Sequence, residues 1–271
     1  MGLRIQNNVE AFNAHRQLVG TGHKMSQSME RLASGFRINR AADDAAGLAI
    51  SEKLRSQIGG LAQAQRNAMD GVSLVQTAEG ALTEVHAMLQ RVRDLAVQFN
   101  NGTLSTADKA AITAEVAQLC AQVSSVGSDT KFNGIALLTG TSTITFQVGA
   151  EDAQTIATSA IALFGSGATF KVDSAIFTFS GTVSLSNIDT AISNVSSSRA
   201  TFGSIQNRMQ HTMNSLSVYQ ENLQASESRI RDVDMASEMV QFTKLQILQQ
   251  AGTSMLSQAN SAPQSVLSLL R

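Results

Sequence analysis

The stretch ALTEVHAMLQRVRDLAVQFN, residues 81–100, decides the fold. A set of its apolar residues follows alternating steps of three and four, the spacing of the a and d positions of a heptad repeat. These residues are Leu82, Val85, Leu89, Val92, Ala96 and Phe99. Side chains spaced in this way form one stripe along an α-helix, and the stripe must be covered by other helices. The stretch therefore predicts a helical bundle.

Similar spacing occurs in three neighbouring stretches. One of them leads into residues 81–100, as part of one long helix or of two nearly collinear helices. The second follows a polar break at residues 100–109, where Ser105 or Thr106 can cap a new helix with Asp108 in its first turn. The stripes comprise Leu54, Ile58, Leu61, Ala68, Val72 and Val75; Ile112, Val116, Leu119, Val123 and Val126; and a third set between Phe202 and Val233. Two such helices joined by a short loop predict an antiparallel pair.

The region from about 130 to 198 differs in composition, because it is rich in Gly, Ser and Thr. Apolar and polar residues alternate at 144–148, 170–172 and 176–179, which is typical of short strands. Residues 172–175 are a plausible hairpin connection. We therefore expect a small β insertion that faces outward at the tip of the bundle.

The two ends of the chain carry weaker helical stripes. Glycines interrupt the N-terminal stripe, and Met and Gln are frequent in the C-terminal one. The stripes are Val9, Phe12, Leu18, Met25, Met29 and Leu32, and Met235, Met239, Phe242, Leu245, Leu248, Gly252, Met255 and Ala259. Each terminal helix would be marginal alone, so we expect both to become ordered only against a partner.

The predicted fold is therefore mainly α. It is a long antiparallel heptad-repeat helical bundle with a small β-hairpin insertion, and its terminal helices pair as a coiled coil on the same side of the molecule. A polar joint with a glycine stop at Gly35 and the acids Asp43 and Asp44 connects the first terminal helix to the bundle.

Composition excludes several classes of function. A net charge of −1 gives no basis for binding nucleic acid or an anionic membrane. Cys120 is the only cysteine, and His15, His23, His86 and His211 form no metal-ligand motif. We expect no enzyme activity, no cofactor and no metal site. The N-terminus has no continuous apolar run of the length that a signal peptide needs, and no segment is apolar for the length of a membrane-spanning helix. By the usual rules this predicts a cytosolic protein.

Three long motifs resemble bacterial flagellin. They are ERLASGFRINRAADDAAGLAISEKL at 30–54, RNAMDGVSLVQTAEGALTEVHAMLQRVRDLAVQ at 66–98, and ENLQASESRIRDVDMASEMVQFTKLQILQQAGTSMLSQAN at 221–260. The resemblance covers about residues 1–135 and 200–271. It implies a subunit that self-assembles into the flagellar filament for swimming motility, outside the cell, after export through the flagellar type III apparatus without a cleaved signal peptide. That implication replaces the cytosolic expectation.

The resemblance also implies a domain organisation and a set of partners. Residues 1–43 and 235–271 would form an inner-core helical domain that becomes ordered on assembly, and residues 44–234 the surrounding helical domain. The partners would be other copies of the chain, a flagellar export chaperone, the filament cap protein and the hook–filament junction protein. The residues expected to drive assembly are Val9, Phe12, Leu18, Met25, Leu32, Met239, Phe242, Leu245, Leu248 and Met255.

A further implication of the resemblance is recognition by Toll-like receptor 5. The contact motif of the family corresponds here to Gln90, Arg91 and Leu95, with Glu115 on the neighbouring helix. Arg91, Leu95 and Glu115 each precede a stripe position. We therefore expect them to lie beside the core and to be free for a receptor or another subunit.

Two alternatives share parts of this pattern. A hook–filament junction protein of the flagellum has similar terminal helices but is incorporated in few copies, so electron microscopy of the purified chain distinguishes it from a filament subunit. A flagellin with a metalloprotease in its central region is disfavoured, because residues 130–198 contain no histidine.

Overall fold

The computed structural model describes residues 8–139, 143–159 and 183–269, and within these ranges the chain forms five α-helices and four short strands. The chain divides into two compact units. Residues 1–56 and 222–271 make up the first unit, and residues 57–221 make up the second unit. The boundaries differ from the predicted 43/44 and 234/235, and the inner-core and outer assignments in a filament stay predictions.

The predicted stripe of residues 82–99 lies on one continuous helix, α2 (Ala45–Phe99). All six stripe side chains are buried. Helix α3 (Thr106–Asp129) begins at Ser105, which forms a capping box with Asp108. The prediction of a capped helix after a polar break is confirmed, because capping depends on residues that are neighbours in the sequence.

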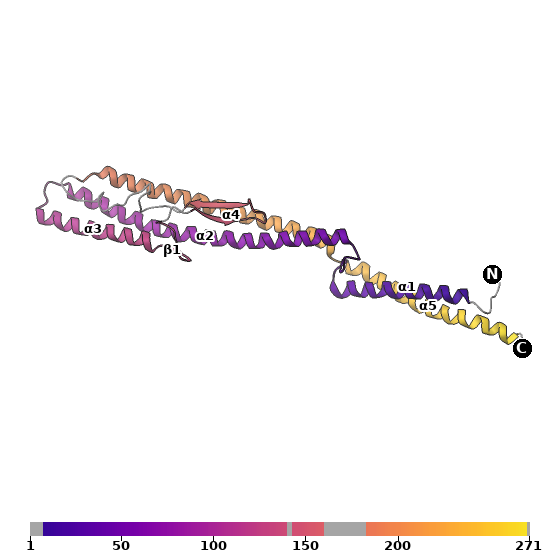
Figure 1. The fold of residues 1–271 in the computed structure, drawn as a ribbon. Helices are drawn as coiled ribbons and strands as arrows, with labels where there is room; N and C mark the ends of the chain where they lie inside the picture. The colour runs from indigo at the N-terminus through magenta and orange to yellow at the C-terminus, as the bar shows by residue number, and fades with distance from the viewer. Residues whose placement is uncertain (1–7, 140–142, 160–182, 270–271) are drawn as a thin grey trace. The chain divides into compact units, whose positions relative to one another are not determined.

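The core of the second unit lies between α2, α3 and α4 (Leu185–Arg231), which Figure 1 shows side by side. Residues from α3 and α4 cover the α2 stripe: Ile112, Val116 and Val123 from α3, and Ile188, Val195, Phe202, Ile205 and Met209 from α4. Burying a side chain of this size contributes about 1.5–3 kcal/mol. The heptad stripes therefore supply most of the core of this unit, and residues of the hairpin region complete it.

Two antiparallel hairpins belong to the predicted insertion. Strands β1 (Lys131–Phe132) and β2 (Ile135–Ala136) are joined by Asn133 and Gly134, whose φ angles of 48° and 80° fit the left-handed turn that a two-residue hairpin requires. Strands β3 (Thr143–Gln147) and β4 (Thr155–Ser159) pair along their whole length. The predicted alternation at 144–148 is thus confirmed as a strand.

The hairpin of β3 and β4 packs on the helices at a glycine. A Cβ atom on Gly71 of α2 would lie 3.3 Å from Phe146 of β3 and 2.8 Å from Met209 of α4. The missing side chain therefore allows the strand and both helices to approach closely.

The predicted insertion extends too far toward the C-terminus. Residues 185–198 are helical and form the first turns of α4. Ile188, Ala191 and Val195 have helical spacing and are buried, but the Ser, Thr and Asn residues between them resemble a loop in composition. The predicted strands at 170–172 and 176–179 and their connection lie outside the described residues.

In the first unit, α1 (Val9–Ser34) and α5 (Met235–Leu269) form the predicted pair of terminal helices, and the two helices run antiparallel (Figure 1). Asn8 Nδ2 donates to the Ala259 carbonyl at one end of the pair (2.7 Å), and Arg31 and Glu238 form an ion pair at the other (3.9 Å). Helix α1 continues through Gly20 and Gly22 and ends at Gly35, whose φ of 75° makes it a left-handed C-cap.

Candidate functional site

The joint that connects α1 to α2 is held against the segment that connects α4 to α5. Phe36 forms an isolated antiparallel β-bridge with Asp232. The Arg37 amide donates to the Arg231 carbonyl (2.7 Å), and the Val233 amide donates to the Gly35 carbonyl (3.0 Å). The Arg231 guanidinium stacks over the Phe36 ring, 4.7 Å from its centroid. The segment that follows α1 and the segment that precedes α5 are therefore held together.

The acids of the joint have structural partners. Asp43 Oδ2 accepts from the Asn39 and Arg40 amides, at 3.2 and 3.0 Å, and Asp43 Oδ1 accepts from Gln27 Nε2 at 2.6 Å. These hydrogen bonds, chiefly that from Arg40, lower the pKa of Asp43. Asp44 Oδ1 accepts from the Gly47 amide (2.9 Å) at the start of α2. The two carboxylates thus organise the turn and the helix start.

The ten residues expected to drive assembly divide into two groups in the single chain. Leu245 is buried, and Leu18, Met25, Leu32 and Phe242 are partly buried. The second group is exposed, and Phe12 in it exposes 72% of its surface. The members of this group are Val9, Phe12, Met239, Leu248 and Met255. The stripe spacing did not identify Val19, Val240 and Ile247, which are also exposed. Single apolar residues outside a stripe carry no periodic signal.

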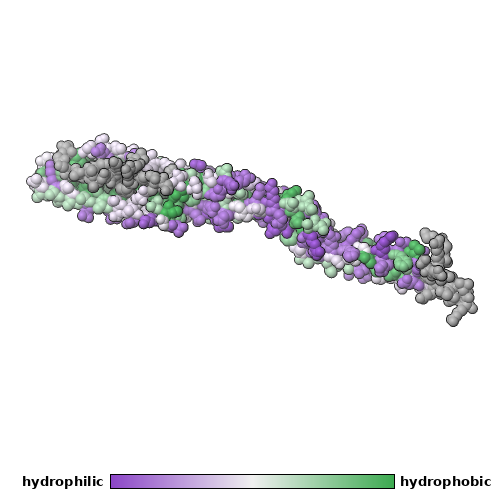
Figure 2. Space-filling model, in the orientation of Figure 1, coloured by the Kyte–Doolittle hydropathy of each residue, from purple (hydrophilic) through white to green (hydrophobic). Residues whose placement is uncertain are grey.

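The exposed apolar residues of α5 lie on both flanks of its buried side and on the opposite side. At about 100° per residue, Leu248 and Met255 lie about 60–80° to one side of the buried Leu245. Met235 and Met239 lie about 80–120° to the other side, and Val240 and Ile247 are roughly opposite. Figure 2 shows green, hydrophobic patches on the outside of the helix pair. A helix with apolar residues on several sides typically packs against several partners, whereas within the single chain α1 covers one side of α5.

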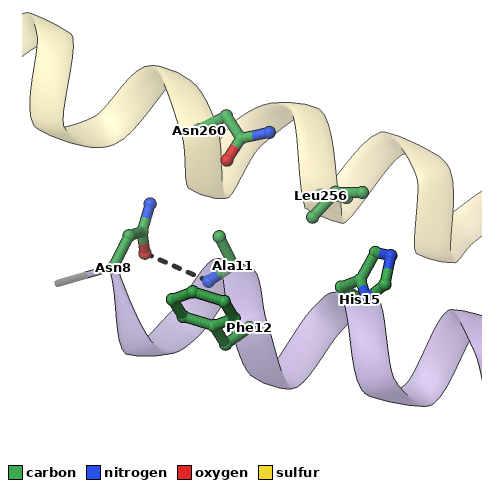
Figure 3. Close-up of a pocket in the computed structure, with 6 residues that line it drawn as sticks. All are labelled: Asn8, Ala11, Phe12, His15, Leu256 and Asn260. Atoms are coloured by element: carbon green, nitrogen blue, oxygen red, sulfur yellow. Dashed lines mark hydrogen bonds between the residues drawn. The ribbon is translucent and has the colours of Figure 1, made fainter.

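A pocket of about 420 Å³ lies between α1 and α5 near the start of α1 (Figure 3). It is lined by Asn8, Ala11, Phe12 and His15 from α1 and by Leu256 and Asn260 from α5. The Asn8 side chain accepts from the Ala11 amide and so caps α1 at the edge of the pocket. The mainly apolar lining suits an apolar side chain of another molecule.

The second predicted site lies on α2 and α3. Arg91 Nη2 and Glu115 Oε1 form an ion pair at 2.8 Å, and both side chains are exposed. Gln90 is exposed, and its Nε2 lies 2.9 Å from His86 Nε2. The structure therefore brings Arg91 and Glu115 together at the surface, and Gln90, which precedes Arg91 in the chain, is exposed as well.

The expectation that Leu95 is free for contacts is wrong, because Leu95 is 2% exposed and belongs to the core. The buried face of α2 is wider than a strict a/d stripe, since both α3 and α4 pack against it. Leu95 lies next to the stripe positions Val92 and Phe99 at helical steps of three and four and is covered with them.

Three further observations concern chemistry. Cys120 is half-buried, and burial raises the pKa of its thiol from 9.0 to about 11. Among the described residues, no group of three or more His, Cys, Asp or Glu side chains could hold a metal ion. Within the same residues, no helix is long and apolar enough to cross a membrane.

Taken together, a bundle with its own core and a helix pair with exposed apolar faces define a subunit that completes its packing in an assembly. The family model described as the bacterial flagellin N-terminal helical region matches residues 5–143, and that of the C-terminal helical region matches residues 185–270. The chain belongs to the flagellin family, which confirms the resemblance.

The relatives match the chain over nearly its whole length. A flagellin of Halalkalibacterium halodurans is 48% identical, covering 98% of this chain and 99% of the relative. A flagellin of Bacillus subtilis is 46% identical, covering 99% of this chain and 100% of the relative. Among solved structures, Bacillus cereus flagellin shares 33% identity with a TM-score of 0.47, covering 56% of this chain and 88% of that chain.

Proposed function

We propose that this chain is the structural subunit of a bacterial flagellar filament and that neighbouring copies cover the exposed faces of α1 and α5. The observation that carries the proposal is the set of exposed apolar residues on the sides of α5 that α1 does not cover. Burial of this surface against other copies supplies a driving force for polymerisation at about 25 cal/mol per Å². The filament is extracellular and serves swimming motility.

A charge on the uncovered face of α5 tests this proposal. Ile247→Asp places a carboxylate where an apolar contact is expected, and it leaves the α1-facing Leu245 unchanged. We expect a monomer with unchanged helix content by circular dichroism that forms no filaments in electron microscopy. The matched control is Gln246→Glu at the adjacent exposed position, which should polymerise. Normal filaments from Ile247→Asp would refute the proposal.

Removal of both terminal segments is a second test. A chain that lacks residues 1–40 and 235–271 should remain folded in the second unit, because the core there comes from α2, α3 and α4. It should not polymerise. Long filaments from this chain would show that the terminal helices are dispensable. Short capped oligomers of the full chain, rather than long homopolymers, would indicate a junction protein.

Membership of the flagellin family implies further partners before and during assembly, which we propose for this chain as well. The exposed apolar residues of α5 require a cover in the cytoplasm, which an export chaperone provides by binding α5. Export through the flagellar apparatus without a cleaved signal peptide, insertion beneath the cap protein and attachment to the junction protein complete the route. Co-purification of the chaperone with the full chain, but not with a chain lacking 235–271, tests the first of these contacts.

Toll-like receptor 5 is the proposed external partner of Gln90, Arg91 and Glu115. These three side chains are exposed, and the ion pair holds Arg91 and Glu115 together. Leu95 supports the surface from beneath. Arg91→Ala should reduce receptor signalling, whereas Arg93→Ala, an exposed arginine of the same helix that pairs with Asp189, should not. Equal signalling by both variants would exclude this epitope.

A further inference from the structure

Exposed methionines are concentrated in the first unit. Met29 on α1 and Met235, Met239 and Met255 on α5 expose between 48% and 65% of their surface. In the second unit, Met209 is fully buried, where it touches the space beside Gly71. Oxidation of methionine depends on access to the sulfur. The four thioethers therefore react in the single chain while the core methionine is protected.

We propose that oxidation of these four methionines by a peroxide controls assembly of the subunit. The thioether sulfur attacks one oxygen of hydrogen peroxide, a sulfur–oxygen bond forms and the O–O bond breaks. The sulfur loses two electrons to the peroxide, and the leaving hydroxide takes up a proton and departs as water. The products are methionine sulfoxide and one water molecule for each peroxide consumed.

The sulfoxide changes the surface at the positions where assembly requires apolar contact. Met235 and Met239 lie on one edge of α5 and Met255 on the other, so that oxidation places polar oxygens on both edges. A buried polar group without a hydrogen-bond partner weakens an interface, by about tenfold or more in the assembly equilibrium for each such group. The inference rests on the proposed role of α5 in the filament.

The modification is reversible. Methionine sulfoxide reductases return each sulfoxide to the thioether, with two thiols oxidised to a disulfide and one water released. In a filament the same sulfurs are covered by neighbouring copies, so that assembled protein resists the oxidant. The state of the monomer at the moment of assembly therefore decides its incorporation.

The experiment uses the full chain as a monomer. Treatment with hydrogen peroxide, removal of the peroxide with catalase and addition of ammonium sulfate should give a critical concentration for polymerisation at least about tenfold above that of untreated protein. Incubation with a methionine sulfoxide reductase and dithiothreitol should restore the original value. Mass spectrometry of peptides should locate sulfoxide at Met29, Met235, Met239 and Met255 but not at Met209.

Substitution of the four methionines tests whether they are responsible for the effect of peroxide on polymerisation. A chain with Met29→Leu, Met235→Leu, Met239→Leu and Met255→Leu should polymerise equally with and without peroxide. The matched control is Met69→Leu, which removes a methionine of similar exposure from the second unit and should stay sensitive. Full sensitivity of the quadruple variant, or insensitivity of Met69→Leu, would overturn the proposal.

Two measurements distinguish a failure of the oxidation proposal from a failure of the assembly proposal. In partly oxidised wild-type protein, the four sulfoxides should be depleted from the filament pellet and enriched in the supernatant, a readout that does not require the quadruple variant to assemble. Equal distribution refutes the oxidation proposal. If Ile247→Asp fails to polymerise while sulfoxide-containing chains polymerise normally, only the oxidation proposal falls; if Ile247→Asp polymerises, the assembly proposal falls as well.

Discussion

At the scale of single residues, neighbouring positions on α2 have opposite roles. Val92 is fully buried between α2 and its partner helices, whereas Val97 on the same helix is 50% exposed. Arg91 is exposed, and Leu95, one turn further on, is buried. A substitution on this helix therefore affects either the stability of the subunit or its surface, according to the exposure of the side chain. Leu95→Ala is unsuitable for testing recognition, because it would create a cavity.

The two valines provide a matched pair. Val92→Ala should lower the free energy of unfolding by about 2 kcal/mol, because two methyl groups are lost from a packed core. Val97→Ala should change it by less than about 0.5 kcal/mol. Urea unfolding of the three monomeric chains measures both values. Equal effects of the two substitutions would contradict the assignment of Val92 to the core.

The rate at which the Cys120 thiol is chemically modified tests whether this side chain is buried. Because burial raises the pKa of the thiol to about 11, the reactive thiolate is scarce at pH 8. We expect slow modification by iodoacetamide in the folded chain, with a rate that rises until the pH passes about 11. In urea the rate at pH 8 should increase, since the pKa returns toward its ordinary value. A fast reaction in the folded chain at pH 8 would show that the thiol is accessible.

At the scale of elements, local signals in the sequence located the starts and ends of helices. Ser105 with Asp108 and the glycine at Gly35 were predictable, because a cap involves residues that are close in the sequence. The start of α4 at Leu185 was not predictable from composition, since Ser, Thr and Asn separate its buried residues. Leu95 was misplaced because the number of helices packed against α2 is a tertiary property.

The capping box of α3 predicts a pH-dependent contribution to stability. The Asp108 carboxylate accepts hydrogen bonds from the Ser105 hydroxyl and amide, which lower the pKa of Asp108 below its usual 3.8. The contribution is therefore present above that value and is lost as the pH falls through the lowered pKa of the folded chain.

Ser105→Ala should reduce the free energy of unfolding by about 1 kcal/mol at pH 7. Thermal unfolding of both chains between pH 7 and pH 2 measures the effect, and the difference between them should shrink in acid. Thr106→Ala, one residue into the helix, is the control and should have the smaller effect at pH 7. A difference that grows in acid would contradict the role of the Asp108 carboxylate.

At the scale of the whole molecule, burial is unequally divided between the units. Among the described residues, the buried apolar side chains of the first unit are Ile38 and Leu245, whereas nearly the whole core belongs to the second unit. The heptad stripes predicted this division, because the terminal stripes are weaker than those of the bundle. The sequence did not predict how many sides of α5 stay uncovered, since that depends on which side faces α1.

The division predicts that the monomer unfolds in two steps. With few buried side chains, the pair of α1 and α5 should lose its helix at a lower urea concentration than α2, α3 and α4. Hydrogen exchange should likewise be faster for amides of 9–34 and 235–261 than for those of the α2 stripe. In the assembled filament the difference should become smaller. A single transition, with equal protection throughout the monomer, would contradict this prediction.

The hydrogen bond between Asn8 and Ala259 joins residues 251 positions apart in the chain. Contacts between α1 and α5 therefore require the closure of a very long loop, and we expect them to form late in folding. The bridge between Phe36 and Asp232 shortens that loop once it has formed. A newly made chain should accordingly spend time without its terminal pair, and the proposed export apparatus could take up an extended terminus during that interval.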